Sequence, residues 1–283
     1  MTALKRLIKR TISRKKRDFP TGIFCYHKVG TVLLSKVFRS ICSVNGWTFE
    51  VLHGMQTRFP KNVDVAVFSH SLVDPSVIRP PLLGVHVIRD PRDVIVSGYQ
   101  YHCRTTEQWC TNTDFSVTPP ILYPQVPYSQ QHRSEVWKAE YLKSLRNKSY
   151  QQNLLDRSQN DGLAFEINHY GTWTIESMEE WDYTHDNILE LRFEKLMGEY
   201  TDTFRLIFHH LQFSDEEINQ YLDLAASHNL KKKSSNEIKK MRHVTSLKTS
   251  RWREYLDPEH KDAIRSRFSS ALLTLGYETD NDW

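Results

Sequence analysis

Short apolar stretches alternate along the chain with longer segments in which apolar residues recur every three or four positions. The short stretches predict strands at residues 22–26, 48–52, 63–68, 84–88 and 188–193. The longer segments predict helices at residues 32–44, 92–101, 134–145, 168–182, 214–226 and 258–273. Strands separated by helices are typical of a parallel sheet with helices on both faces. The pattern therefore predicts an α/β fold around a central parallel β-sheet of about five strands.

Other segments lack this pattern. Residues 103–135 hold several prolines among polar residues, so we expect surface loops there and also over 145–165, while residues 228–251 read as a mobile basic segment. The chain has 283 residues, enough for one large domain, with two small domains as the alternative. We expect a basic tail over residues 1–20 and a single domain over 21–283. No run of 18 apolar residues predicts a transmembrane helix.

The positive charge of the chain is concentrated at its N-terminus. The formal net charge is +4, but residues 1–17 contain eight basic residues and no acidic one, which leaves 30 basic and 34 acidic residues in the rest. A slightly acidic body argues against a dedicated nucleic-acid-binding protein. The tail reads either as a solvated terminus or as a short basic amphipathic helix that touches an anionic membrane surface. It lacks a secretory signal, so we predict a cytoplasmic protein.

The cysteines do not indicate a metal site. Cys25, Cys42, Cys103 and Cys110 form no CxxC pair, and no Cys/His group has the spacing of zinc ligands. We expect reduced thiols and no metal cofactor.

The stretch 23–34 carries the first candidate chemistry. An apolar strand runs into Lys28, Gly30 and Thr31, and a helix follows at once. The free amides of a helix start suit an anion, and glycine allows a sharp turn close to a phosphate. The loop is not a Walker A motif, because its lysine precedes its only glycine, and this disfavours a nucleoside-triphosphate kinase. Taken alone, a structural turn with a solvated lysine would look much the same.

A second candidate anion site lies in the stretch 84–99. Arg89 stands at a predicted strand end and Ser97 lies about two helical turns later. An arginine fork and a hydroxyl at this spacing could hold a terminal phosphate. The alternative is an arginine that pairs with Asp90 or Asp93.

The two stretches together resemble the motifs of the sulfotransferases that depend on 3′-phosphoadenosine 5′-phosphosulfate (PAPS). Residues 26–31 (YHKVGT) are similar to the family's 5′-phosphosulfate loop, and residues 89–97 (RDPRDVIVS) to its 3′-phosphate motif. The resemblance covers roughly residues 21–256. It implies a P-loop-like three-layer fold and transfer of a sulfuryl group from PAPS to an acceptor. The product is then 3′-phosphoadenosine 5′-phosphate (PAP), and no metal is required.

The resemblance also implies roles for particular residues. Lys28 would stabilise the leaving 5′-phosphate, and His70, in the stretch VFSHSL, would act as general base with an imidazole near its ordinary pKa. Tyr170, in YGTW, matches a tyrosine that contacts the adenine, and residues 189–196 match the following core strand. The positions implied to bind the donor are Lys28, Val29, Gly30, Thr31, Val32, Leu33, Arg89, Ser97, Tyr170, Leu230, Ser246 and Lys248.

Some positions depart from the family pattern. Val32 and Leu33 stand where members usually carry threonine and tryptophan, and Leu230 stands where they often carry an adenine-stacking phenylalanine. The Arg-Lys-Gly clamp near the C-terminus is missing, and Ser246, Lys248 or Arg242 would replace it.

The acceptor is expected to be a small metabolite, such as a microbial natural product, and the sequence leaves open whether a hydroxyl or an amine accepts the sulfuryl group. Tyr101, His102 and Tyr123 are candidates for the walls of its site, although such aromatic residues are as often packing. The rival functions are a nucleotide-dependent small-molecule kinase and a non-catalytic nucleotide-binding protein with the same fold. The sequence leaves the oligomeric state open.

Overall fold

The structure is a computed structural model, and it describes residues 17–113, 130, 132–234 and 248–283. The candidate residues Tyr123, Ser246 and Arg242 lie outside the described residues, as do the apolar positions of the basic tail. Arg17, which the sequence places in that tail, is buried. Its guanidinium donates to Thr21 Oγ1 and to the carbonyl of Leu211, each at 2.7 Å.

A five-stranded parallel sheet forms the centre of the structure, as predicted. Its strands are β1 (Thr21–Phe24), β2 (Phe49–Leu52), β3 (Val65–Phe68), β4 (Leu83–Ile88) and β5 (Ile188–Arg192). The spatial order is β2-β3-β1-β4-β5, and every neighbouring pair is parallel. All residues of β1 and β3 are buried, because both faces of a parallel sheet are covered, and such strands read as continuous apolar runs.

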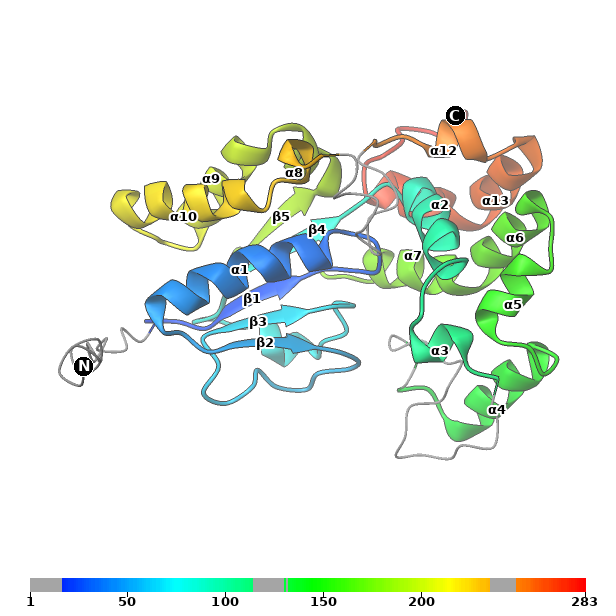
Figure 1. Cartoon of the computed structure of the whole chain (residues 1–283), viewed down its shortest axis with the longest axis horizontal. Helices are drawn as coiled ribbons and strands as arrows, with labels where there is room; N and C mark the ends of the chain where they lie inside the picture. Colours follow the sequence, from blue (N-terminus) through cyan, green and yellow to red (C-terminus); the bar gives the residue numbers. More distant parts are fainter. Residues whose placement is uncertain (1–16, 114–129, 131, 235–247) are drawn as a thin grey trace, which may run out of the picture.

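One group of helices lies along the sheet and supplies much of the core. It contains α1 (Thr31–Asn45), α8 (Phe193–Gly198), α9 (Tyr200–His210) and α10 (Asp215–Ser227). Helix α1 packs against β2, β3 and α10, and α9 packs against α10 (Figure 1). Phe38 of α1 and Phe208 of α9 are fully buried, with ring centroids 6.4 Å apart. Ser214 is the N-cap of α10 and forms a capping box with Glu217.

A second group of helices gathers beyond the carboxyl ends of the strands, on the right of Figure 1. It contains α2 (Pro91–His102), α3 (Gln108–Thr111), α4 (Glu135–Ser144), α5 (Tyr150–Leu155), α6 (Gln159–Glu166), a π-helical turn η3 (Ile167–Gly171), α7 (Thr172–Glu179), α12 (Trp252–Tyr255) and α13 (Pro258–Thr274). Two short 3₁₀ turns complete the elements, η1 (Pro75–Ile78) and η4 (Leu230–Lys232).

The structure corrects the sequence analysis at several places. Residues 145–165 are not a loop region, because they form α5 and α6, which begin at the capping serines Ser149 and Ser158. Helix α3 lies within residues 103–135, where loops were expected. Helices α8, α9 and α12 were also not predicted. The predicted helix over 168–182 is confirmed in part, since it starts with the π-helical turn and ends at Glu179.

Candidate active site

The loop between β1 and α1 makes a tight bend at the carboxyl edge of the sheet. Lys28 and Gly30 both have positive φ angles, of 62° and 90°. The backbone carbonyl of Tyr26 accepts hydrogen bonds from the amide of Val29 and from Thr31 Oγ1, each at 3.1 Å. Gly30 is the N-cap of α1 and has no side chain that could cap the helix. No side chain of the N-cap residue therefore accepts a hydrogen bond from the first amides of α1. The bend therefore has the geometry of an anion-binding helix start.

Tyr26 anchors this loop to three neighbouring elements. Its hydroxyl donates to the carbonyl of Ser177 on α7 at 3.1 Å and lies 2.9 Å from His86 Nε2 on β4. His86 Nδ1 lies 2.5 Å from Glu190 Oε2 on β5, and the imidazole stacks on Trp181 with centroids 4.1 Å apart. Burial lowers the pKa of His86. The loop is thus held from below by a buried polar network.

Arg89 brings the second predicted anion site into contact with this loop. Its Nη1 donates to the carbonyl of Lys28 at 3.0 Å. The guanidinium lies 4.8 Å from the ring centroid of Phe193 and 3.7 Å from Asp93 Oδ2, and the residue is 6% exposed. Ser97 is buried two turns further along α2. The two predicted motifs therefore meet at one place in the fold.

Asp93 joins Arg89 to the C-terminal part of the chain. Its Oδ2 accepts from the amide of Ser250 at 2.7 Å, and its Oδ1 accepts from the amide of Trp252 at 3.0 Å. The predicted residue Lys248 lies just before this turn. Its side chain is exposed and lies 3.9 Å from Glu254.

His70 follows the end of β3, and its neighbours fix the turn that carries it. Ser71 has a positive φ of 54°, and its hydroxyl donates to the carbonyl of Cys25 at 2.9 Å. Ser69 Oγ lies 2.9 Å from His53 Nδ1, and the rings of His53 and His70 are 6.5 Å apart. Burial, with a smaller contribution from His53, lowers the pKa of His70 to about 3. The expectation of an ordinary imidazole pKa at this position is therefore wrong.

Lys28 lies over an aromatic ring. Its Nζ is 4.2 Å from the ring centroid of Tyr101, which is almost completely buried on α2. Burial, followed by the nearby guanidinium groups of Arg89 and Arg104, lowers the pKa of Lys28 to about 7, while Glu107 opposes them. The half-buried ammonium group is therefore only partly hydrated and is sensitive to each charge around it.

The remaining predicted aromatic positions form a packed cluster beneath the loop. His102 is fully buried, stacks on His27 with centroids 4.8 Å apart, and places Nδ1 2.9 Å from Glu166 Oε2. Tyr170 is also buried, 4.5 Å from the ring of His27 and 4.7 Å from that of His102. Their predicted contacts with acceptor and adenine remain predictions.

The departures from the family pattern differ in their surroundings. Val29 and Leu33 are buried in the core, whereas Val32, in the first turn of α1, is 39% exposed. Leu230 begins η4 and packs partly against the core. An exposed valine at this helix start can offer an apolar surface to a ligand but no hydrogen bond.

The sequence analysis missed residues that act from outside the motifs. The ring of His53 lies 6.5 Å from that of His70, and Glu107 influences the pKa of Lys28. Neither residue belongs to a motif, and only their places near strand or helix ends could have indicated them. Glu190, on the other hand, stands at an inward-facing position in an apolar strand, and a charged residue there indicates a buried partner.

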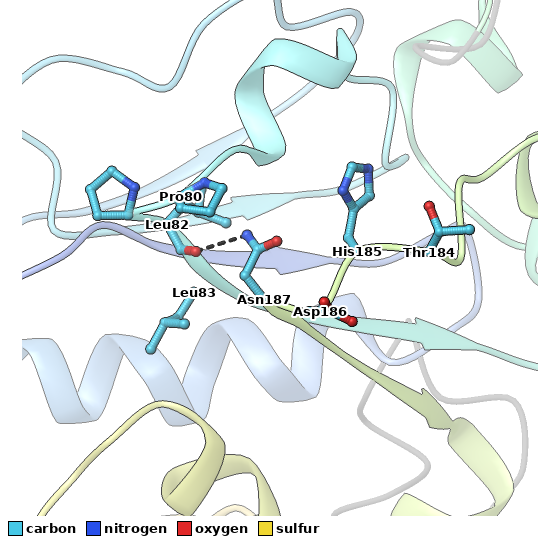
Figure 2. Close-up of a pocket in the computed structure, with 8 residues that line it drawn as sticks. Pro80, Leu82, Leu83, Thr184, His185, Asp186 and Asn187 are labelled. Carbon is cyan, nitrogen blue, oxygen red and sulfur yellow. Dashed lines mark hydrogen bonds between the residues drawn. The ribbon is translucent and has the colours of Figure 1, made fainter.

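An open hollow of about 490 Å³ lies at the opposite edge of the sheet. Figure 2 shows Leu82, Leu83 and Asn187 among its lining residues, where β4 and β5 begin. Two of the lining residues are bonded to each other, because the side-chain amide of Asn187 donates to the carbonyl of Leu82 at 2.8 Å. Ligands of open parallel α/β sheets bind outside the carboxyl ends of the strands, so this hollow is not the candidate site.

Among the described residues, no group of three or more His, Cys, Asp or Glu residues is placed to hold a metal ion. In the same part of the chain, no helix is long and apolar enough to cross a bilayer.

A helix start with uncapped amides and a buried arginine meet at the carboxyl edge of this open parallel sheet, which is where α/β proteins of this type bind their ligands. The family model described as "Sulfotransferase domain" matches residues 56–276, more than half of the chain. The chain therefore belongs to the sulfotransferase family, which confirms the predicted family and class of enzyme. The match does not include the loop at Lys28, so the proposed role of this loop depends on its geometry.

Solved structures with a similar fold include two complexes. Mouse sulfotransferase SULT7A1 complexed with PAP is 16% identical with a TM-score of 0.48, and the match covers 92% of this chain and 86% of that one. Retinol dehydratase in a complex with retinol and PAP is 16% identical with a TM-score of 0.50, covering 92% and 83%. At such identity the likeness describes the fold alone. A search of the curated proteins gives no match.

The positive φ of Gly30 predicts that a side chain at this position destabilises the protein. An added Cβ would lie 3.2 Å from the ring of Phe193, so Gly30→Ala combines left-handed strain with crowding. The matched control is Gly46→Ala at the end of α1, where φ is 68° and an added Cβ meets nothing within 4 Å. Each variant should lose about 1 kcal/mol from left-handed strain. Urea unfolding should show a larger loss for Gly30→Ala, and equal losses would contradict the crowding.

Proposed function

We propose that this chain transfers a sulfuryl group from PAPS to a hydroxyl or amine of a small-molecule metabolite. The observation that carries the proposal is the 3.0 Å hydrogen bond from Arg89 to the carbonyl of Lys28. It joins the loop expected to receive the 5′-phosphosulfate to the arginine expected to receive the 3′-phosphate. One nucleotide with phosphates at both positions suits such a pair of adjacent anion sites.

Sulfuryl transfer, like phosphoryl transfer, asks the protein for positioning and charge stabilisation more than for covalent chemistry. In this proposal, negative charge builds on the oxygen that bridges sulfur and the leaving 5′-phosphate. Lys28 and the first amides of α1 stabilise that charge, and they are held in place before the reaction begins. The aromatic platform below Lys28 restricts the directions in which its ammonium group can point.

His70 is the proposed general base. Its lowered pKa keeps the imidazole neutral over the whole range around neutrality, so it is ready to accept the proton of the acceptor. The same low pKa makes it a weak base in the free enzyme, and the imidazolium that forms needs a partner. The negatively charged sulfuryl oxygens are the group that transfer brings close to it.

Because His70 is the proposed general base, the proposed acceptor site is next to its imidazole, near the carboxyl ends of β2 and β3. We further propose that the acceptor is a microbial natural product and that the protein is cytoplasmic. The proposed peripheral membrane contact of the tail concerns residues outside the described part of the chain.

Two rival functions make different predictions about ligands. A small-molecule kinase would be stabilised by ATP with Mg²⁺, whereas the proposed function requires stabilisation by PAP, and thermal unfolding with each ligand separates them. A non-catalytic relative would bind PAP and turn over no PAPS. We favour the enzyme because both anion-binding motifs and the histidine are present together.

Lys28→Ala should abolish transfer, because the leaving 5′-phosphate then loses the ammonium group that is proposed to stabilise it. Turnover of PAPS with a mixed pool of small hydroxyl and amine compounds is measured by mass spectrometry. Lys36→Ala, at an exposed position of α1, is the control and should keep full activity. Transfer by Lys28→Ala at the wild-type rate would contradict the role.

His70→Ala should lower kcat by at least about 10²-fold, the smaller effect expected for loss of a general base. PAP affinity should stay unchanged in calorimetry, because the histidine is proposed to contact the acceptor proton rather than the nucleotide. The exposed His209→Ala on α9 serves as the matched control. A variant that turns over normally would rule out general-base catalysis by His70.

Arg89→Ala should weaken PAP binding by about 10- to 100-fold, the range expected for a lost hydrogen bond to a charged group. Adenosine 5′-phosphate lacks the 3′-phosphate and should lose less affinity than PAP. Calorimetry with both ligands, and with the exposed Arg205→Ala as control, measures the difference. Equal losses for the two ligands would mean that Arg89 only supports the loop.

A further inference from the structure

Lys28 lies on one end of a chain of three fixed contacts. Its Nζ is 4.2 Å from the ring centroid of Tyr101, and the Tyr101 hydroxyl donates to Glu107 Oε1 at 2.8 Å. Trp109 Nε1 donates to the other oxygen, Glu107 Oε2, at 2.6 Å. Tyr101 and Trp109 are both buried. The carboxylate of Glu107 is therefore held by two immobile donors, and it in turn holds the ring below the lysine.

The charges around Lys28 come from several elements. Arg89 at the end of β4 and Arg104 after α2 both disfavour its ammonium form, as does burial. Glu107, just before α3, acts in the opposite direction. Glu107 also favours the charged form of His53 across the site.

A tyrosine that donates a strong hydrogen bond to a carboxylate has an electron-richer ring. The face of such a ring attracts a cation more strongly, and the attraction grows when the cation is dehydrated. Glu107 therefore acts on Lys28 in two ways, directly through its negative charge and indirectly through the Tyr101 ring.

We propose that Glu107 is a positioning residue of the transfer reaction, which acts through Tyr101 to keep Lys28 protonated and directed into the phosphosulfate loop. This inference rests on the proposed function, because it gives Lys28 the role of stabilising the leaving phosphate. Glu107 itself need touch neither the donor nor the acceptor.

The sign of the pH dependence follows from the charge of Lys28. The ammonium form is the active one and is lost as the pH rises through the lysine pKa. Removing the charge of Glu107 lowers that pKa, so the active form disappears at a lower pH. A purely structural role of Glu107 would instead reduce activity by a similar factor at every pH.

The first test measures the protonation of Lys28 without any nucleotide. The full chain is labelled with acetic anhydride over a range of pH, and the acetylation of Lys28 is followed by mass spectrometry. Glu107→Gln should lower the titration midpoint by about one pH unit, and Tyr101→Phe should lower it less, because the ring remains. Glu216→Gln, an exposed carboxylate at the start of α10, is the matched control. An unchanged midpoint in folded Glu107→Gln, checked by thermal unfolding, would overturn the proposal.

The second test follows kcat/KM for PAPS with pH, which reports groups of the free enzyme. With a wild-type midpoint near 7, a drop of one pH unit means a loss in Glu107→Gln of about twofold at pH 6 and about tenfold at pH 8. Glu107→Asp, which keeps the charge, should restore part of the activity at pH 8. A loss that is equal at both pH values would contradict the inference.

The two tests separate the inference from the function on which it rests. If no variant and not even the wild type transfers a sulfuryl group, the proposed function fails while the labelling midpoint of Lys28 still decides the role of Glu107. If transfer is normal in the wild type and the midpoint does not move, the inference alone fails.

Discussion

The bend between β1 and α1 is the constraint on which the site depends. Two residues in left-handed conformation, Lys28 and Gly30, reverse the chain within one turn. The reversal exposes the first amides of α1 and turns the carbonyl of Lys28 toward Arg89. A non-glycine residue in this conformation costs free energy, and the surrounding structure must supply it. The hydrogen bonds of Tyr26 with Ser177 and His86 do so from the opposite side of the loop.

The arginine end of the site shows how a buried charge is made tolerable. A guanidinium that is taken out of water is costly unless it is paired, and Arg89 donates to one carbonyl and lies 3.7 Å from one carboxylate, while its Nε has no hydrogen-bond partner among the described residues. That carboxylate, Asp93, also binds the amides of Ser250 and Trp252, which lie more than 150 residues further along the chain. The surroundings of Arg89, where the 3′-phosphate is proposed to bind, therefore come from the end of β4 together with the C-terminal segment.

Much of the fold could be predicted because parallel strands are buried on both faces and so leave plain apolar runs. The site motifs could be predicted because they are local, with Lys28, Gly30 and Thr31 within four residues. Helices α5 and α6 were missed because a short helix contains too few residues for a clear apolar periodicity. In the sequence, only their N-terminal serine caps indicate them. The surroundings of the individual site residues could not be predicted from local sequence patterns. Neither the low pKa of His70 nor the place of Tyr101 beneath Lys28 follows from neighbours in sequence, since both arise from packing between distant elements.

The dehydration of Lys28 has a consequence for the order of events in the proposed reaction. A lysine whose pKa lies at about 7 is only partly charged in the free protein at neutrality. An arriving phosphosulfate is negative and favours the ammonium form, so donor binding and proton uptake at Lys28 are linked and each strengthens the other. The full positive charge then exists mainly when the donor is there to use it. A buried, fully charged lysine between two arginines would oppose folding, and a site that becomes fully charged only on binding avoids part of that cost.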